Sequence, residues 1–313
     1  MKLHPLEYET RQVIRQRSLL TPGSRVVLGV SGGADSMALL LVLAALRHEF
    51  ELALTAVYVD HGLRPVESRA EAGLVTEQAE ALGVDFRRGT IPVRDRAGQN
   101  GQSLEAAARE LRYGFLQQVA RELGGAVIAV GHQADDQAEE LLLRLIRGSG
   151  RAGLAGMPWV NAAGVIRPFL GFTRERLRDY LRASGVRWLE DSSNADRRFR
   201  RNRVRGELLP LLEERFSPGV RESLRRTAEI LDSEEELLIA MARQAFGRVQ
   251  VAAPVRGEPP PAQDLRLAAD VLSREPLALR RRVMELALVR LGAPASFRAI
   301  ADLLTLAGRT GGG

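Results

Sequence analysis

The chain has 313 residues, 45% of them apolar, so it can form one large folded domain or two of ordinary size. It has no cysteine, which excludes disulfides, thiolate metal sites, iron–sulfur clusters and a cysteine nucleophile. The net charge of +6 suits a polyanionic partner, whereas 5% aromatic residues argue against a stacking platform for single-stranded nucleic acid. Because Met1–Arg17 has no apolar signal region and the longest apolar run, Met37–Leu46, is too short to cross a bilayer, we expect a cytoplasmic protein without membrane association.

The first distinctive stretch is a strand, a glycine turn and a helix start. Arg25–Val30 is an apolar run of strand length, SGGADS follows at 31–36, and a helix is predicted over Met37–Leu46 with Ser36 or Asp35 as its cap. The two glycines permit positive φ and close approach to a ligand, so this corner is expected to bind phosphate through backbone N–H groups. The alternative is an ordinary corner without a ligand. Phosphate loops that end in Lys-Ser/Thr are excluded, because Lys2 is the only lysine.

Strands and helices alternate along the first half of the chain. Strands are predicted at Leu52–Val59, Asp85–Ile91 and Ala126–Val130, and helices at Leu6–Leu19, Ser68–Leu82, Ser103–Leu123 and up to Arg147. This alternation indicates an α/β fold with a doubly wound, mostly parallel sheet. Ligands bind beyond the carboxyl ends of such strands, where the polar stretches 31–36, 60–64 and 132–136 all fall. We therefore expect one crevice to collect all three.

The second half of the chain is mainly helical by its pattern. We predict an edge segment at Val165–Leu170, a proline-rich linker or loop at Ala252–Gln263, and helices at Arg174–Ser184, Val220–Ala245, Leu277–Leu291 and Ser296–Leu306. We place a catalytic domain at residues 1–215 and a smaller helical domain at residues 216–313.

Several carboxylates fall at the predicted ligand edge. Because a carboxylate that faces phosphates repels them unless a cation intervenes, we interpret Asp35 as a Mg²⁺ ligand rather than only a helix-dipole cap. His132 precedes an acidic helix start in which Asp136, Glu139 and Glu140 share one face. These three hold Mg²⁺ or an ammonium group, or they only complement the helix dipole.

Arginines gather in two places. Arg109 and Arg112 follow Glu105 on one predicted helix, where the spacing fits a surface ion pair and a phosphate contact equally well. A denser run suits an RNA backbone or the phosphates of a nucleotide, although such runs are usually solvated. Its members are Arg197, Arg198, Arg200, Arg201, Arg203 and Arg205.

Taken together, these stretches resemble the tRNA(Ile)-lysidine synthetase family of PP-loop ATP pyrophosphatases. SGGADS alone indicates only the superfamily. The specific matches are VGHQADDQAEELLLRLIRGSGRAGLAGMP (130–158) and EDSSNADRRFRRNRVRGELLP (190–210). Further matches, in the family's order over about the first 215 residues, are YVDHGLRP (58–65), GQSLEAAARELRYGFL (101–116) and VIRPFL (165–170).

The resemblance implies a fold of the adenine nucleotide alpha hydrolase type and a two-step ligation. ATP adenylates the C2 oxygen of the wobble cytidine in an isoleucine tRNA with a CAU anticodon, and free L-lysine then displaces AMP to give lysidine. The implied cofactors are ATP and Mg²⁺, and the implied partners are this tRNA and lysine. Residues 216–313 take a tRNA-binding or accessory role. The oligomeric state stays open, with a homodimer as one option.

The resemblance also implies roles for individual residues. Asp35 binds the metal, Asp136 and Glu139 bind lysine, and tRNA is bound by Arg198, Arg201 and Arg205. The catalytic residues are Asp35, Arg112, His132, Asp136 and Arg203. The ATP-binding residues are Ser31, Gly32, Gly33, Ala34, Asp35 and Ser36.

The chain departs from the family pattern in two positions and in length. Gln133 and Glu140 stand where the pattern has His and Thr, next to the expected lysine and metal contacts. Because the chain ends at Gly313, short of the longer members, we expect a second C-terminal tRNA-binding domain to be absent. Two alternatives stay open: another PP-loop tRNA-modifying enzyme, against which the lack of cysteine counts, and a non-catalytic tRNA- or nucleotide-binding module.

Overall fold

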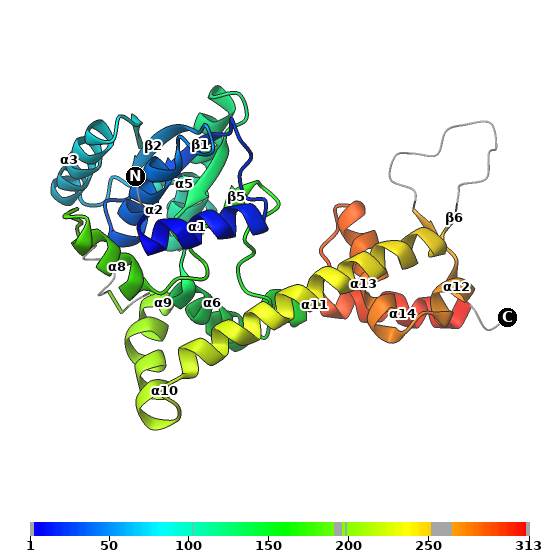
Figure 1. Ribbon diagram of the computed structural model, residues 1–313. Coiled ribbons are helices and arrows are strands. Elements are labelled where there is room, and N and C mark those ends of the chain that lie inside the picture. The colour runs from blue at the N-terminus through cyan, green and yellow to red at the C-terminus, as the bar shows by residue number, and fades with distance from the viewer. Residues whose placement is uncertain (1–2, 102, 191–195, 198, 252–264, 311–313) are drawn as a thin grey trace. The chain divides into compact units, whose positions relative to one another are not determined.

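The centre of the fold is a parallel sheet made of short, largely apolar strands (Figure 1). The computed structural model describes residues 3–101, 103–190, 196–197, 199–251 and 265–310. The strands are β1 (Arg25–Gly29), β2 (Ala53–Asp60), β3 (Asp85–Thr90), β4 (Val127–Val130) and β5 (Val165–Ile166). Their order is β3-β2-β1-β4-β5, so the chain moves from one side of β1 to the other between β3 and β4. The β1–β4 boundary is therefore the topological switch point, where sheets of this type bind ligands.

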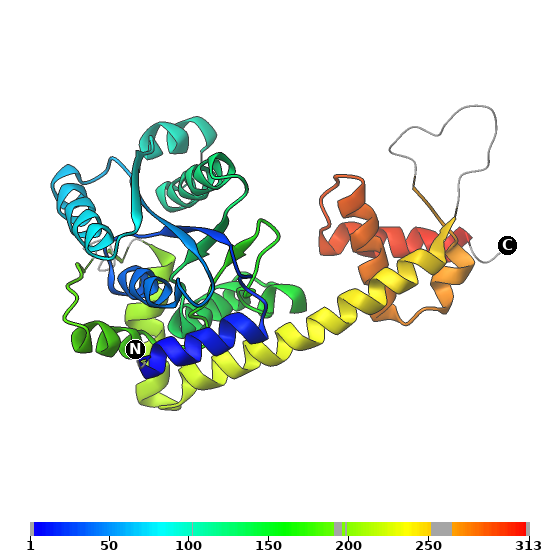
Figure 2. The same cartoon turned by 45° about the horizontal axis from the view of Figure 1, so that its top comes forward.

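Helices cover both faces of the sheet (Figure 2). One face packs against α1 (Pro5–Gln16), α2 (Ala34–Leu46), α3 (Pro65–Ala81) and α8 (Arg174–Ala183). The other face packs against α5 (Leu104–Glu122), which follows α4 (Val93–Asn100). Helix α2 is buried on nearly all sides, which its almost unbroken apolar sequence explains. The doubly wound parallel α/β fold predicted from the sequence is confirmed.

The chain beyond β4 forms further helices beside the switch point. These are α6 (Ala134–Ile146), α7 (Arg151–Leu154), α9 (Arg200–Arg203) and α10 (Leu209–Arg215), with a π-helical turn, Val204–Leu208, between the last two. Leu142 and Leu143 of α6 pack with Val204 and Leu209 in a small apolar core. This core fixes the arginine-rich stretch alongside α6.

Contacts divide the chain into two units, Met1–Glu229 and Ile230–Gly313, and the division falls inside α11 (Val220–Val249). Our predicted boundary lies earlier, after residue 215. The second unit is mainly helical, as predicted, with α12 (Ala269–Arg274), α13 (Leu277–Arg290), α14 (Phe297–Thr310) and the short antiparallel strands β6 (Gln250–Val251) and β7 (Arg266–Leu267). Among all described helices, none combines the length and the apolar character that a membrane crossing needs.

Some elements differ from their predictions. Helix α2 begins at Ala34 rather than Met37, because Gly33 is its N-cap and the Ser36 hydroxyl turns back to the loop instead of capping. Helices α4, α10 and α12 were not predicted, because they are short and lack a long apolar repeat. The linker predicted at 252–263 lies outside the described residues.

Candidate active site

The phosphate loop, residues 31–36, is held in shape by its own hydrogen bonds. Gly32 has φ +82°, a left-handed conformation that favours glycine. The Ser36 hydroxyl accepts a hydrogen bond from the Ser31 N–H at 3.1 Å and donates one to the Gly33 carbonyl at 2.9 Å. Because Gly33 caps α2, the first N–H groups of that helix have no partner within it. The loop therefore has the geometry of an anion site.

Gly131 brings the end of β4 against this loop. A Cβ atom at Gly131 would lie 2.8 Å from the Asp35 carbonyl oxygen and 3.1 Å from the Ser36 nitrogen. Glycine is required here, because any larger residue would have to displace backbone atoms. The close approach places His132, the next residue, beside the phosphate loop.

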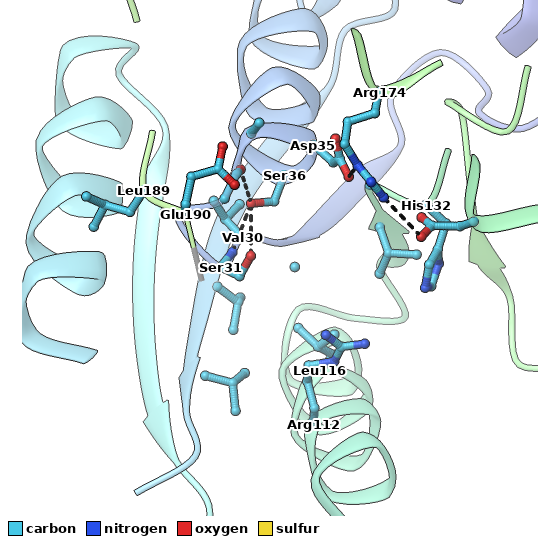
Figure 3. Close-up of a pocket in the computed structure, with 18 of the residues that line it drawn as sticks. Val30, Ser31, Asp35, Ser36, Arg112, Leu116, His132, Arg174, Leu189 and Glu190 are labelled. Atoms are coloured by element: carbon cyan, nitrogen blue, oxygen red, sulfur yellow. Dashed lines mark hydrogen bonds and ion pairs between the residues drawn. The ribbon is translucent and has the colours of Figure 1, made fainter. Parts of the chain in front are cut away.

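A pocket of about 270 Å³ opens at the carboxyl ends of β1, β2 and β4 (Figure 3). It is lined by Ser31 and Asp35 from the phosphate loop, by His61 after β2 and by His132 after β4. Arg112 reaches it from α5. All three polar stretches that the sequence places at strand ends thus contribute to one pocket at the switch point.

The carboxylate of Asp35 is only weakly compensated by the described residues around it. Its Oδ1 is buried and has no hydrogen-bond partner within the described part of the chain, and its Oδ2 is 3.9 Å from Arg174 Nε. Burial, together with repulsion from Asp136, raises the pKa of Asp35 from 3.8 to about 7. A divalent cation bound at Asp35 would neutralise this charge, so the residue fits a Mg²⁺ ligand. Because the described residues form no cluster of three or more acidic or histidine ligands, such an ion would take its remaining ligands from phosphate and water.

His132 is buried as a neutral imidazole. Burial lowers the pKa of His132 from 6.5 to about 3, and the charges of Arg112 and Arg167 add to this effect against the opposing charge of Asp136. Its Nδ1 is buried and lacks a hydrogen-bond partner within the described ranges. At neutral pH His132 therefore offers a hydrogen bond to a ligand without adding positive charge.

Asp136 and Glu139 of α6 pair with two arginines. Arg201 donates to Glu139 at 3.0 Å and to Asp136 at 3.1 Å, while Arg205 donates to Glu139 at 2.6 Å and to Asp136 at 3.3 Å. Burial acts to raise the pKa of Asp136, but the charges of Arg201 and the other cations around it outweigh this, so the net pKa is lowered. These residues form one wall of the site. We call Asp136, Glu139, Arg201 and Arg205 the ion-pair cluster.

Comparisons with known proteins agree with this fold and site. The PP-loop domain family matches residues 3–212. A tRNA(Ile)-lysidine synthase from Symbiobacterium thermophilum is 39% identical over 98% of this chain and 64% of its own length. One from Gloeobacter violaceus is 38% identical over 91% of this chain and 83% of its own length. The chain belongs to the tRNA(Ile)-lysidine synthase family. The resemblance seen in the sequence is thereby confirmed.

Other members of the tRNA(Ile)-lysidine synthase family are longer. The chain spans 55% of the relative from Geobacter sulfurreducens, to which it is 39% identical. Among solved structures, a U34-tRNA thiolase from Methanococcus maripaludis superposes with a TM-score of 0.59 at 18% identity, over 73% of this chain and 80% of that one. That likeness shows the shared fold.

The structure brings most of the site residues predicted from the sequence together in this pocket. The pocket is lined by Ser31, Gly33, Ala34, Asp35, Ser36, Arg112, His132, Asp136 and Arg205. Gly32 and Glu139 lie behind this lining, where Gly32 shapes the loop and Glu139 pairs with Arg205. Arg203 stays away from the pocket, exposed and 3.8 Å from Glu207. Arg198 lies outside the described residues.

Two predicted tRNA contacts, Arg201 and Arg205, face α6 instead of open solvent. The exposed fractions of their side chains are 19% and 23%, against 63% for Arg203. Their role in tRNA binding stays a prediction. In this structure their charges are already matched by the carboxylates of the ion-pair cluster.

Some residues of this pocket were not predicted from the sequence. Arg174, Arg178 and Leu189 line the pocket without having been singled out, and His61 was predicted there only as part of the stretch 60–64. The Leu189 N–H donates to the Gly32 carbonyl at 3.0 Å, which brings the segment after α8 against the phosphate loop. Because this contact joins distant parts of the sequence, no local pattern signals it. Glu190 also lines the pocket, and it was within reach, since it opens the matched stretch at 190–210.

The two departures from the family pattern have partners of their own. Gln133 is fully buried and caps α6, and its side-chain oxygen accepts a hydrogen bond from the Asp135 N–H at 2.6 Å. Glu140 accepts one from Arg144 Nε at 2.7 Å. Each departing side chain is thus fixed by contacts within the chain, and neither opens a gap in α6.

Proposed function

We propose that this chain ligates free L-lysine to C2 of the wobble cytidine in CAU-anticodon isoleucine tRNA, using ATP and Mg²⁺. The observation that carries the proposal is the preformed phosphate loop with the weakly compensated Asp35 and the neutral His132 beside it, in a chain of the tRNA(Ile)-lysidine synthase family. The cytoplasm, which holds all three substrates, is the proposed location.

The proposed chemistry takes two substitutions. The C2 oxygen of cytidine attacks the α-phosphorus of ATP, a phosphorus–oxygen bond forms, and pyrophosphate leaves. The ε-ammonium of lysine then loses a proton to water, and the ε-amine so formed attacks C2. A carbon–nitrogen bond forms, AMP leaves with the former C2 oxygen, and the attacking nitrogen releases a second proton. ATP is therefore consumed to AMP and pyrophosphate for each lysidine formed.

Residues of the phosphate loop serve the first step. The N–H groups at the start of α2 bind the departing pyrophosphate, and Asp35 holds Mg²⁺. When bound, the ion neutralises charge on the phosphates. His132 donates a hydrogen bond to the α-phosphate, and Arg112, whose Nε is buried without a described partner, supplies positive charge from α5.

Residues of the ion-pair cluster serve the second step. Asp136 and Glu139 orient the ε-ammonium of lysine, although both carboxylates are already paired with Arg201 and Arg205. Binding therefore requires lysine to share these carboxylates with the arginines or to displace one guanidinium. Arg203, which is exposed beside Glu207, is left to contact RNA from outside the pocket.

The test is transfer of radiolabelled lysine to unmodified CAU-anticodon isoleucine tRNA in the presence of ATP and Mg²⁺. Native protein is expected to label the tRNA, and Asp35→Ala is expected to lower the rate by at least about a hundredfold, because it removes the carboxylate that would hold Mg²⁺ at the phosphates. Asp85→Ala, at an exposed position on β3, is the matched control and should keep the native rate.

Two other outcomes would contradict the proposal in different ways. Pyrophosphate release that depends on RNA but gives no lysine label would keep the ATP chemistry and reject lysine as the second substrate. Native rates for Asp35→Ala would reject the assigned site even if lysine were transferred.

A further inference from the structure

A group of arginines on the α5 side of the pocket has no carboxylate within 4.0 Å among the residues that the structure describes. Arg109 and Arg112 both place their guanidinium carbons 5.3 Å from the centre of the Tyr113 ring. The Tyr113 side chain also lies against Arg167, which follows β5. We call Arg109, Arg112, Tyr113 and Arg167 the α5 basic group.

The α5 basic group carries three positive charges without an ion pair. The spacing of Glu105 and Arg109 allows a pair, but within the described residues neither Arg109, Arg112 nor Arg167 has a carboxylate within 4.0 Å. The side-chain Nε atoms of Arg112 and Arg167 are buried and have no hydrogen-bond partner in the same part of the chain. Nearby arginines that do face carboxylates, such as Arg201, are fully paired. An anion is the missing counter-charge.

The three arginines of the α5 basic group differ in how far they are exposed to solvent. Arg109 is exposed, Arg112 is half-buried at the pocket wall, and Arg167 is only 3% exposed. Arg167 Nη1 donates to the Pro158 carbonyl at 2.7 Å, so this guanidinium is fixed behind Tyr113. Arg109 and Arg112 can contact a ligand, while Arg167 acts as a positioning residue for Tyr113.

The arrangement favours an RNA phosphodiester over the phosphates of ATP. The phosphate loop already provides an anion site at the start of α2, and Figure 3 shows Arg112 and Leu116 on α5 at the other side of the pocket from Arg174. Arg109 does not line the pocket and faces solvent. An RNA strand that places one base in the pocket would contact Arg109 at the solvent side and Arg112 at the pocket wall. A free nucleotide held in the pocket would not reach Arg109.

We propose that Arg109 and Tyr113 form a binding site for the RNA phosphodiester next to the nucleotide that enters the pocket, while Arg112, which lines the pocket, keeps its role at the α-phosphate. The inference rests on the proposed function and adds a contact to the RNA backbone next to the pocket. Exposed arginine with an aromatic neighbour suits a backbone contact that is independent of base identity.

The test measures the affinity of the full chain for unmodified CAU-anticodon isoleucine tRNA at several salt concentrations. Arg109→Gln should weaken binding about threefold to tenfold and lower the slope of log affinity against log salt by about one, since one phosphate contact is lost. Arg109→Lys should restore most of the affinity. Arg121→Gln, which removes an exposed arginine on the same helix, should match the native chain.

The apparent KM for ATP separates the two phosphate sources. A rise in this KM in Arg109→Gln with unchanged tRNA affinity would assign the group to ATP and overturn the inference. Equal tRNA affinity in Arg109→Gln and Arg121→Gln would also overturn it. Because binding needs no lysine transfer, a native chain that transfers no lysine but binds tRNA through Arg109 would reject the proposed function alone.

Discussion

At the scale of single residues, the site is defined by a weakly compensated carboxylate and by buried polar atoms without a hydrogen-bond partner. Asp35 is held next to a loop built for anions, and one of its oxygens has no hydrogen-bond partner among the described residues. His132 is neutral because it is buried and because cations lie near it. Both residues are therefore costly to the apo fold, and both costs are relieved when a ligand supplies the missing charge or hydrogen bond.

Asp35→Asn is expected to stabilise the apo protein while abolishing lysine transfer. The pKa of Asp35 is about 7 in the folded chain and 3.8 for an ordinary aspartate, which stands for the unfolded chain. Between these pH values only the folded state keeps the proton, so the free energy of unfolding falls as the pH rises. The advantage of Asn over the native residue should grow by about 2–3 kcal/mol from about pH 5 to about pH 8. Thermal unfolding without divalent ions measures it, with Asp85→Asn as control. An advantage that does not change with pH would contradict the assigned pKa shift.

His132 should stay neutral across the range in which histidines normally gain a proton. Burial lowers its pKa to about 3, so its imidazole signals should not shift as the pH falls from about 8 to about 5. Nitrogen-resolved NMR of the imidazole rings measures this, and His132→Gln assigns the signal. A titration midpoint of His132 above about pH 6 would show that the ring is not desolvated as the structure has it.

At the scale of elements, the local part of the site follows from the sequence and the long-range part does not. The strand, glycine turn and helix at 25–46 are set by neighbouring residues, and their positions were predicted within a few residues. The start of α2 was missed because Gly33 takes the cap position that Ser36 or Asp35 was expected to fill. The Arg201–Glu139 pair joins residues 62 apart in sequence, and a charge run alone does not reveal which carboxylates it meets.

Gly131→Ala tests the contact between β4 and the phosphate loop. The added Cβ would lie 2.8 Å from the Asp35 carbonyl oxygen, so the end of β4 must move away from the loop. We expect a loss of about 1–3 kcal/mol in the free energy of unfolding and a lower affinity for ATP. Gly114→Ala on α5, where a Cβ meets nothing within 4 Å, is the matched control and should be neutral or slightly stabilising. Native ATP affinity in Gly131→Ala would show that the close approach is dispensable.

At the scale of the whole molecule, each unit has its own core and its own ion pairs. In the second unit, Arg282 Nη1 and Nη2 contact the two carboxylate oxygens of Glu235 at 2.5 and 2.6 Å, and Glu235 is only 7% exposed. The pair joins α11 to α13 beside an apolar core that includes Ala245 and Val283. Its geometry is the bidentate form that arginine and carboxylate prefer.

Glu235→Ala is expected to destabilise the second unit by about 3–5 kcal/mol, because Arg282 is left without its partner in a largely buried place. Hydrogen exchange should rise in α12 to α14, while the sheet of the first unit keeps its native protection. The double variant Glu235→Ala with Arg282→Met should recover part of the loss. Uniform loss of protection in both units would contradict their independence.

The ion-pair cluster also sets when the active site can assemble during synthesis. All five strands of the sheet have left the ribosome once residue 166 has, yet Arg201 and Arg205 come later. Until they emerge, Asp136 and Glu139 are two neighbouring carboxylates without those counter-charges, and burying them is unfavourable. We therefore expect a nascent chain that ends before residue 201 to form the sheet while α6 is not yet stably packed. The arginine-rich stretch is the last part of the pocket's wall to emerge, so we expect a growing chain to complete this pocket only when the first unit is nearly complete.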